Sequence, residues 1–147
     1  MEEDDELNLD LLLKALDNED NDSLMSLDIA KIQNIKNNVL EKLGLKKKEL
    51  DDLKNKLLQY RYVDELPDIK YGSYIRWISL RRPDNIKLTN GGFICDILVN
   101  DAGIHLKCRN GGSRFFQISM AENLIFQKLT EQEIILLSVI DYLNEED

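Results

Sequence analysis

The stretch GFICDILVNDAGIHLKCRNGGSRFFQIS, residues 92–119, decides the fold. Apolar and polar residues alternate in two runs, 93–99 and 104–109, and the Asn-Asp-Ala-Gly segment between the runs is typical of a tight turn. A second glycine turn at 110–113 leads into a third run, FFQIS. Alternation with a period of two residues therefore predicts three antiparallel strands joined by two hairpins.

The first turn also predicts a register. With Asn100 opposite Gly103, one face of the hairpin carries the core pairs, which are Val99–Ile104, Ile97–Leu106 and Cys95–Cys108. The other face pairs Asp96 with Lys107, two opposite charges. A slip by one residue would turn the whole apolar set toward water, so this register is well specified.

The second turn must contain an odd number of loop residues if the apolar side chains of the third strand are to lie on the same face as those of the first two. A three-residue loop places Phe116 opposite Cys108 and leaves Phe115 and Gln117 on the outer face, beside Arg109 and Lys107. Outside this stretch, residues 71–80 are rich in strand formers, and residues 124–128 predict a fifth short strand. Five short strands with one apolar face favour a small SH3-like or OB-like antiparallel β-barrel, because closure removes exposed edges.

The barrel and a C-terminal helix are expected to fill residues 64–147 of an α+β protein. Thr130 and Glu133 form a capping box, with Thr at the N-cap and Glu three residues later. The helix that follows is broadly apolar, so we expect it to lie against the barrel or to plug its end.

Residues 27–63 show two apolar stripes at helical spacing, and these stripes are offset from each other. One interpretation is a helical hairpin that turns at Gly44, a residue well suited to end a helix. The other is a continuous coiled coil whose offset is a stutter. Either form leaves apolar seams that need a partner surface, so residues 28–60 are a candidate homodimer interface.

Residues 1–26 combine many acidic residues with a cluster of leucines. Such a composition predicts a disordered acidic tail with a short Leu-rich motif that binds a protein partner. The residues expected to bind are Leu9, Leu12, Leu13 and Leu16. The alternative interpretation is a tail that only adds solubility.

Charge is unevenly spread along the chain, whose net charge is −9. Residues 1–30 carry −10 and residues 119–147 carry −6, whereas residues 67–118 carry +4. The predicted sheet is thus a basic region between acidic ends. The sequence begins without a signal peptide and has no apolar run of transmembrane length, which predicts an intracellular protein with reduced cysteines, although their adjacency would allow a disulfide.

The residues of a catalytic centre are not apparent in the sequence. A single histidine, His105, and two cysteines expected in the core do not make a zinc site, and the paired glycines are not followed by the Lys-Ser/Thr of a phosphate-binding loop. We therefore expect a protein that is not an enzyme and holds no metal or cofactor.

One surface of the predicted sheet combines cations with aromatic rings, the combination that binds single-stranded nucleic acid by stacking and by contacts with phosphates. The candidate binding residues are Arg76, Arg81, Arg82, Lys107, Arg109 and Phe115. The alternative is that Phe115 lies under a helix and that the cations only keep the barrel soluble.

Four segments, YRYVDELPDIKYGSYIRWISL, LTNGGFICDI, IHLKCRNGGSRFFQI and IFQKLTEQEIILL, together resemble an uncharacterised protein family of large nucleocytoplasmic DNA viruses. The resemblance covers about residues 60–143. It implies a setting, which is an infected host cell, a viral factory or a virion, and it brings no functional residues.

Two functions are thus predicted. The first is a non-enzymatic viral interaction module that contacts nucleic acid or a nucleoprotein through the basic and aromatic sheet face. The second is a structural or scaffold protein that oligomerises through its N-terminal helices and recruits protein partners with its acidic Leu-rich tail.

Overall fold

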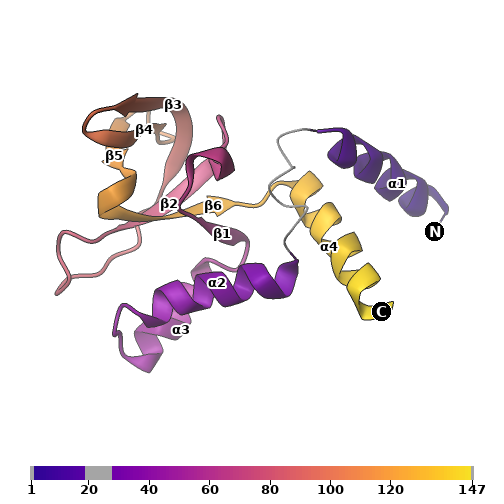
Figure 1. The fold of residues 1–147 in the computed structure, drawn as a ribbon, viewed down its shortest axis with the longest axis horizontal. Helices are drawn as coiled ribbons and strands as arrows, with labels where there is room; N and C mark the ends of the chain where they lie inside the picture. The colour runs from indigo at the N-terminus through magenta and orange to yellow at the C-terminus, as the bar shows by residue number, and fades with distance from the viewer. Residues whose placement is uncertain (1, 19–27, 147) are drawn as a thin grey trace. The chain divides into compact units, whose positions relative to one another are not determined.

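The structure is a computed structural model that describes residues 2–18 and 28–146, with side chains described for 9–18 and 28–143. It is an α+β fold with four helices and an antiparallel sheet, as the sequence predicts (Figure 1). In chain order the elements are α1 (Glu2–Asp17), α2 (Ile29–Glu41), α3 (Lys47–Lys56), β1 (Tyr60–Val63), the 3-10 turn η2 (Leu66–Asp68), β2 (Tyr74–Ser79), β3 (Gly92–Asn100), β4 (Gly103–Arg109), β5 (Phe115–Ser119), the 3-10 turn η3 (Met120–Glu122), β6 (Asn123–Lys128) and α4 (Glu131–Glu146).

The chain divides into two compact units. Residues 35–128 form one unit, which holds the whole sheet and is called the sheet unit below. Residues 1–34 and 129–147 form the other, which holds α1 and α4 and is called the helical unit. The boundary between the two units falls within α2.

The sheet has six strands in the order β1-β6-β2-β3-β4-β5, and every neighbouring pair is antiparallel. The sequence predicted five, and the strand it missed is β1, which was assigned to the helical segment 27–63. Tyr60 continues the apolar helical stripe and is also the first of four residues rich in strand formers, so local pattern alone does not separate the two states. Pairing with β6 along the whole of β1 selects the strand.

The predicted register of the hairpins is confirmed from the turn inward. Asp96 pairs with Lys107, Ile97 with Leu106 and Val99 with Ile104, and on the next strand Phe116 pairs with Cys108. Beyond Asp96 the prediction is wrong, because a β-bulge between Ile94 and Asp96 leaves Cys95 unpaired.

The bulge changes the expected position of both cysteines. Ile94, rather than Cys95, lies opposite Cys108 and is buried, whereas Cys95 is exposed. Both thiols are free, so the considered disulfide is absent. Phe93, expected on the core face, is turned to the outer one and is 51% exposed.

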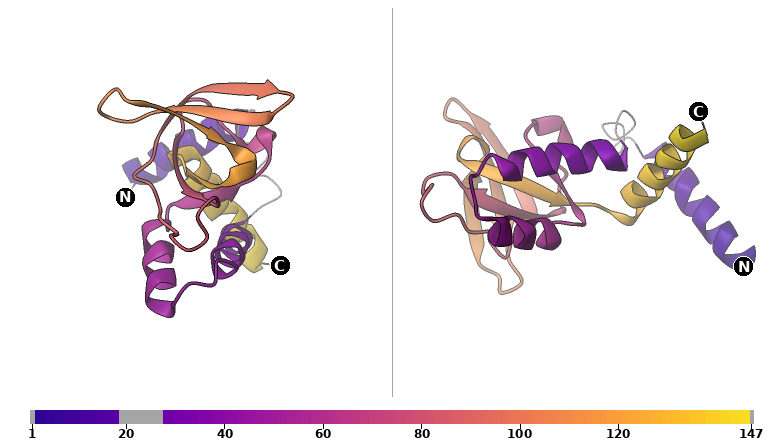
Figure 2. Two further views of the ribbon diagram at one scale, coloured as in Figure 1. Left: turned by 90° about the vertical axis from the view of Figure 1, so that its left-hand side faces the viewer. Right: turned by 90° about the horizontal axis from the view of Figure 1, so that it is seen from below.

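One buried cluster takes side chains from all six strands. Its members are Val63, Ile69, Ile75, Trp77, Ile94, Leu106, Cys108, Ile118 and Ile125. A flat sheet could not bring the inner faces of its first and last strands to a common core, so the sheet must curve strongly around this cluster, as the two views in Figure 2 show. The described residues show no pairing between the edge strands β1 and β5, so the predicted barrel closure is not confirmed.

The opposite face of β1, β6 and β2 is covered by α3 and the end of α2. Leu40, Leu53 and Leu57 pack there on Phe126 and Ile78. The segment forms two helices, and Gly44 between them has φ of +69°, a conformation that favours glycine. The helical hairpin itself stays a prediction.

A buried lysine fixes the end of α3 to this packing. Lys36 is only 1% exposed, and its ammonium donates to the carbonyl oxygens of Leu57 at 2.7 Å and Tyr60 at 3.0 Å. These carbonyls lie just beyond the last turn of α3, where backbone acceptors have no helical partner. Burial lowers the pKa of Lys36 to about 8.

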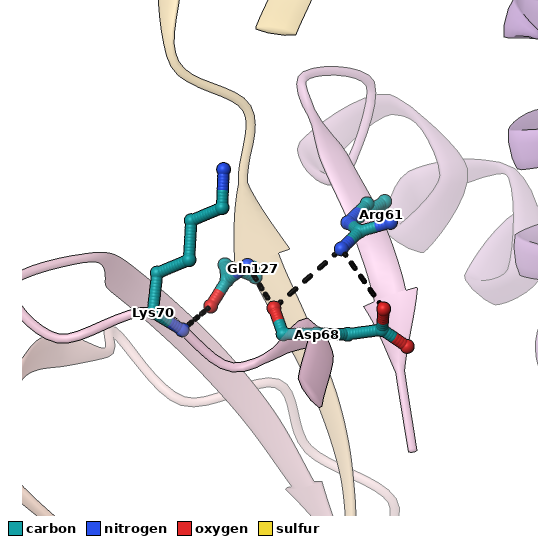
Figure 3. Close-up of polar contacts among 4 residues, drawn as sticks. All are labelled: Arg61, Asp68, Lys70 and Gln127. Atoms are coloured by element: carbon teal, nitrogen blue, oxygen red, sulfur yellow. Dashed lines mark hydrogen bonds and ion pairs between the residues drawn. The ribbon is translucent and has the colours of Figure 1, made fainter. Parts of the chain in front are cut away.

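A second polar cluster fixes η2 to the sheet. The Gln127 side chain accepts from the backbone N–H of Lys70 at 3.0 Å and donates to the carbonyl of Asp68 at 2.9 Å. Arg61, 3% exposed on β1, reaches the Asp68 carboxylate at 3.5 Å (Figure 3). Because these groups are buried and paired, they hold the turn in one position.

In the helical unit, α1 and α4 are packed together, and Asn18 Nδ2 donates to Gln132 Oε1 at 2.9 Å. The capping box is confirmed, since Thr130 Oγ1 accepts from the Glu133 N–H at 3.1 Å and Glu133 Oε1 accepts from the Thr130 N–H at 3.0 Å. Within this unit α4 contacts α1, and the packing of α4 on the barrel stays a prediction.

The helix α1 lies where the sequence predicted a disordered tail. Its leucines recur at helical spacing and Ala15 is fully buried, so packing within the helical unit accounts for the difference. Residues 19–27 of that predicted tail lie outside the described residues.

Candidate nucleic-acid interface

The outer face of the sheet carries a transverse row of side chains, which we call the aromatic row. Tyr74 on β2 pairs with Phe93 on β3, Phe93 with Arg109 on β4, and Arg109 with Phe115 on β5. Directly paired residues of antiparallel strands lie on the same face, so the row presents ring, ring, cation and ring in sequence across four strands.

The rings of this row are organised, and two of them are open to solvent, whereas Tyr74 is half-buried and packs against the cluster under the helices. The centroids of Tyr74 and Phe93 lie 5.0 Å apart with an interplanar angle of 75°, an edge-to-face contact. Phe93 is 51% and Phe115 54% exposed. Two large rings exposed in one row leave apolar surface that contact with another molecule would bury.

A second row of paired residues lies next to the first. It consists of Asp96, Lys107 and Gln117 on β3, β4 and β5. The Lys107 ammonium lies 4.9 Å from the centroid of the Phe115 ring, a cation–π contact that joins the two rows. Cations and rings are therefore interleaved on the outer face, as the sequence predicts.

The turn between β4 and β5 holds Arg109 in place. Asn110 Oδ1 accepts from the N–H groups of Gly112 at 2.9 Å and Arg114 at 3.0 Å, so the turn is closed by a side chain. One guanidinium nitrogen of Arg109 donates to Ser113 Oγ at 3.0 Å. This contact orients the guanidinium, and among the described residues no other hydrogen bond occupies its remaining donors.

The remaining predicted arginines are not part of the aromatic row. Arg76 is half-buried on β2, where its Nε donates to the Thr89 carbonyl at 2.8 Å. Arg81 follows β2 and donates to Glu122 Oε2 at 2.8 Å. Arg82 is exposed in the same loop. Of the six predicted residues, the structure brings three onto adjacent strands, namely Lys107, Arg109 and Phe115.

Phe93 and Tyr74 are not among the binding residues that the sequence predicts. Trp77 belongs to the core cluster, so Tyr74 is the outward ring. A signal for Phe93 existed in the spacing of Ile94 and Ile97, since two apolar residues three apart in a strand share one face only if a bulge lies between them.

Gly91, directly before β3, lets the row form. Gly91 has φ of +94°, and a Cβ there would lie 2.3 Å from the Ile75 carbonyl oxygen and 2.9 Å from the Tyr74 ring. Only glycine allows the chain to approach β2 this closely. The close approach brings Phe93 beside Tyr74.

Charge in the sheet unit suits an anionic ligand. Residues 35–128 contain 17 basic and 11 acidic side chains, a net charge of +6, whereas the chain as a whole carries −9. A cationic surface of this kind attracts polyanions from a distance set by the Debye length, about 8 Å at physiological salt.

A groove of about 440 Å³ lies between α3 and the loop after β2, at a different place in the sheet unit. Its walls carry charges of both signs, from Glu49, Asp52, Asp84, Lys56 and Lys87. Mixed charge gives this groove no preference for an anion. Within the described residues, no group of three or more His, Cys, Asp or Glu side chains is placed to hold a metal ion.

The four predicted partner-binding leucines lie on α1. Leu9, Leu13 and Leu16 are exposed, and Leu12 is half-buried. None of the helices in the described ranges combines the length and the apolar character needed to cross a membrane. Comparisons with protein-family models, with curated proteins and with solved structures find no match for this chain.

Proposed function

We propose that the outer face of β3, β4 and β5 binds single-stranded nucleic acid, free or within a nucleoprotein, and that the protein acts as a non-enzymatic interaction module. The observation that carries the proposal is the aromatic row, in which three rings flank one guanidinium across four strands. Bases of any kind can stack on an exposed ring, and each stacked base contributes about 1–3 kcal/mol to the free energy of binding.

The covered and open parts of this face differ in a way that favours the proposal. On β1, β6 and β2 the face is buried under helices, with Phe126 fully buried. On β3 to β5 the same face of the sheet carries Phe93, Lys107 and Phe115, and each of these side chains is exposed. A protein that needed only stability would have gained from covering these rings as well.

The proposal also includes the type of β-sheet architecture. We propose that the sheet is an SH3-like barrel, since β2 to β5 form a meander, η3 turns the chain back, and β6 pairs with β2. The shared core of all six strands supports a rolled sheet. The setting implied by the sequence resemblance, an intracellular one during infection by a large DNA virus, belongs to this proposal too.

The test is fluorescence anisotropy of a labelled oligothymidine and a labelled oligouridine, titrated with the full chain. We expect micromolar binding that weakens with salt, because phosphate contacts release counterions. The double variant Phe93→Ala/Phe115→Ala should lose at least about fivefold in affinity, the lower bound for one lost stacking contact. Lys107→Glu/Arg109→Glu should abolish binding.

A matched control separates this face from general charge. Lys47→Glu/Lys48→Glu makes the same change in net charge at the start of α3, on exposed residues outside the aromatic row. We expect this control to retain binding within about threefold. Equal losses in both charge variants, or no binding at tens of micromolar, would contradict the proposal.

A second candidate function is the structural or scaffold protein that oligomerises and recruits partners. The exposed leucines of α1 favour recruitment. For oligomerisation through residues 28–60, the structure leaves less surface than the sequence suggested, because Leu40, Leu53 and Leu57 are buried within the sheet unit. Light scattering of the full chain tests this candidate, which predicts a stable oligomer insensitive to salt.

A further inference from the structure

The helix α1 presents an apolar stripe that the described residues of the helical unit do not cover. Leu9, Leu13 and Leu16 are 57%, 53% and 48% exposed. Their spacing of four and three residues places them on one side of the helix, which we call the leucine face. Ala15 is fully buried, so a different side of α1 makes the packing contact within the helical unit.

The second helix of the unit adds to this apolar surface. On α4, Leu136 and Leu137 are buried, but Tyr142 and Leu143 near its end are 60% and 55% exposed. The start of α2 also belongs to the unit and packs Ile32 on Leu137, yet it leaves these side chains of α1 and α4 exposed. The unit therefore has the surface of an incomplete helical bundle.

Charge indicates what completes the bundle. Residues 1–34 and 129–147 contain 17 acidic side chains against Lys14 and Lys31, a net charge of −15. A second copy of the same unit would bring a further −15 to the interface and would be repelled. A cationic partner would gain from the same field, so charge complementarity selects against self-association.

The charges next to the leucine face fit a basic partner in detail. Asp10 and Asp17 are exposed beside the leucines, and Lys14 is paired with Asp10 at 3.2 Å. The described rim of the apolar stripe thus carries two carboxylates and one lysine, a net charge of −1, within a strongly acidic unit. Lysines or arginines that flank an apolar seam on a partner would lie opposite these carboxylates.

We propose that α1 and α4 dock a basic amphipathic helix from another protein, with the apolar seam of that helix on the leucine face and its cations over the acidic rim. A helix fits because the leucines recur at the spacing of a helix seam, and a further helix would cover the leucine face. The inference rests on the second candidate function, in which the protein recruits partners, and it specifies the chemistry of the partner. It does not depend on the nucleic-acid site.

The experiment is a calorimetric titration of the full chain with three synthetic peptides of equal length. One has leucines at every third and fourth position with lysines elsewhere, one replaces its lysines with glutamates, and one is oligolysine. We expect the Leu-Lys helix to bind at least tenfold more tightly than oligolysine and the Leu-Glu helix not to bind. Oligolysine binding as tightly as the Leu-Lys helix would overturn the proposal, because charge alone would then suffice.

Variants locate the site. Leu9→Gln/Leu13→Gln/Leu16→Gln keeps the charge and should weaken the Leu-Lys helix at least tenfold. The control replaces three exposed apolar residues of the sheet unit, as Leu58→Gln/Leu98→Gln/Val99→Gln, and should bind within about twofold of the unchanged chain. Equal affinity of both triple variants, or a homodimer that the leucine variant dissociates, would also overturn the proposal.

The two sites can fail separately. The leucine variant should keep the anisotropy response to oligothymidine, since it leaves the sheet unit intact. If the unchanged chain forms an oligomer but does not bind the Leu-Lys helix, the inference is wrong and the scaffold role stands. If the unchanged chain is a monomer that binds the Leu-Lys helix, the inference holds and the predicted oligomerisation is wrong.

Discussion

The two units of this chain differ in both charge and burial. The sheet unit carries +6 and the helical unit −15. Among the described residues, the sheet unit holds fifteen of the nineteen buried hydrophobic side chains, whereas the much smaller helical unit holds seven of the fifteen large hydrophobic side chains that are exposed. One unit has a large core of its own, and the other leaves many of its apolar side chains exposed.

This difference teaches that a single average over the chain is misleading. The overall charge of −9 argues against an anionic ligand, yet the unit that carries the rings and cations is basic. The comparison also predicts different stabilities, since buried apolar area is the main source of folding free energy. Two probes can follow the units, because Trp77, the sole tryptophan, lies in the sheet core and α1 and α4 contribute to helical circular dichroism at 222 nm.

The largest effect is expected from Gly91→Ala in the sheet unit. Its new Cβ would meet backbone at 2.3 Å in a positive-φ conformation, so we expect a loss of about 3 kcal/mol or more. The measurement is urea unfolding followed by Trp77 fluorescence. Gly72→Ala is the control, because its φ is also positive, at +78°, but the space is open, and it should cost about 1 kcal/mol.

The next effect concerns Lys36 and pH. Because burial lowers its pKa in the folded state to about 8, the unfolded chain binds more protons above that pH, and stability rises with pH from about 8 toward 10.5. Tyr60, Tyr62 and Cys108 have raised pKa values and act in the opposite direction at higher pH.

The difference between the unchanged chain and Lys36→Met isolates the lysine. We expect this difference in unfolding free energy to grow by about 2 kcal/mol in favour of lysine between pH 7.5 and 9.5. Urea titrations of both proteins across this range provide the measurement. A difference that stays constant with pH would show that Lys36 is charged to the same extent in both states.

A smaller effect is expected in the helical unit from Thr130→Ala. The substitution removes the hydroxyl that accepts from the Glu133 N–H, and loss of such a cap costs about 1 kcal/mol. Part of the 222 nm transition should move to lower urea, while the Trp77 transition stays in place. If both probes move together here and in Gly91→Ala, the two units unfold as one and the comparison fails.

The smallest expected effect on stability comes from breaking one exposed ion pair in each unit. Asp10–Lys14 on α1 and Asp52–Lys56 on α3 are both exposed ion pairs four residues apart. Asp52→Asn should cost about 0.3 kcal/mol, whereas Asp10→Asn should cost less, because it also relieves repulsion in a strongly acidic unit. Urea titrations at low and at high salt should show the gap between the two variants closing as salt rises.

The sequence predicted those parts of the fold that depend on neighbours in the chain. The turn at 100–103 fixes the pairing of Asp96 with Lys107, and the capping box fixes the start of α4. For the same reason the sequence placed Lys107, Arg109 and Phe115 together, since all three are set by one hairpin.

What the sequence did not predict depends on distant contacts. Tyr60 becomes part of a strand because β6, more than sixty residues later, pairs with it. Arg61 and Gln127 are buried because they meet Asp68. The burial of Lys36, in contrast, could be predicted from the sequence, since this lysine lies on the apolar stripe between Ile32 and Leu40.

The bulge at Cys95 also bears on which changes of chain length the sheet accepts. Ile94 and Asp96 already pair with the consecutive residues Cys108 and Lys107, so β3 contains one residue more than its ladder uses. Deleting Cys95 would leave a regular strand with every pair and both faces unchanged, whereas deleting a neighbour such as Ile97 would reverse the faces on one side of the gap. Within this strand, a homologue shorter by one residue is therefore expected to have lost it at the bulge.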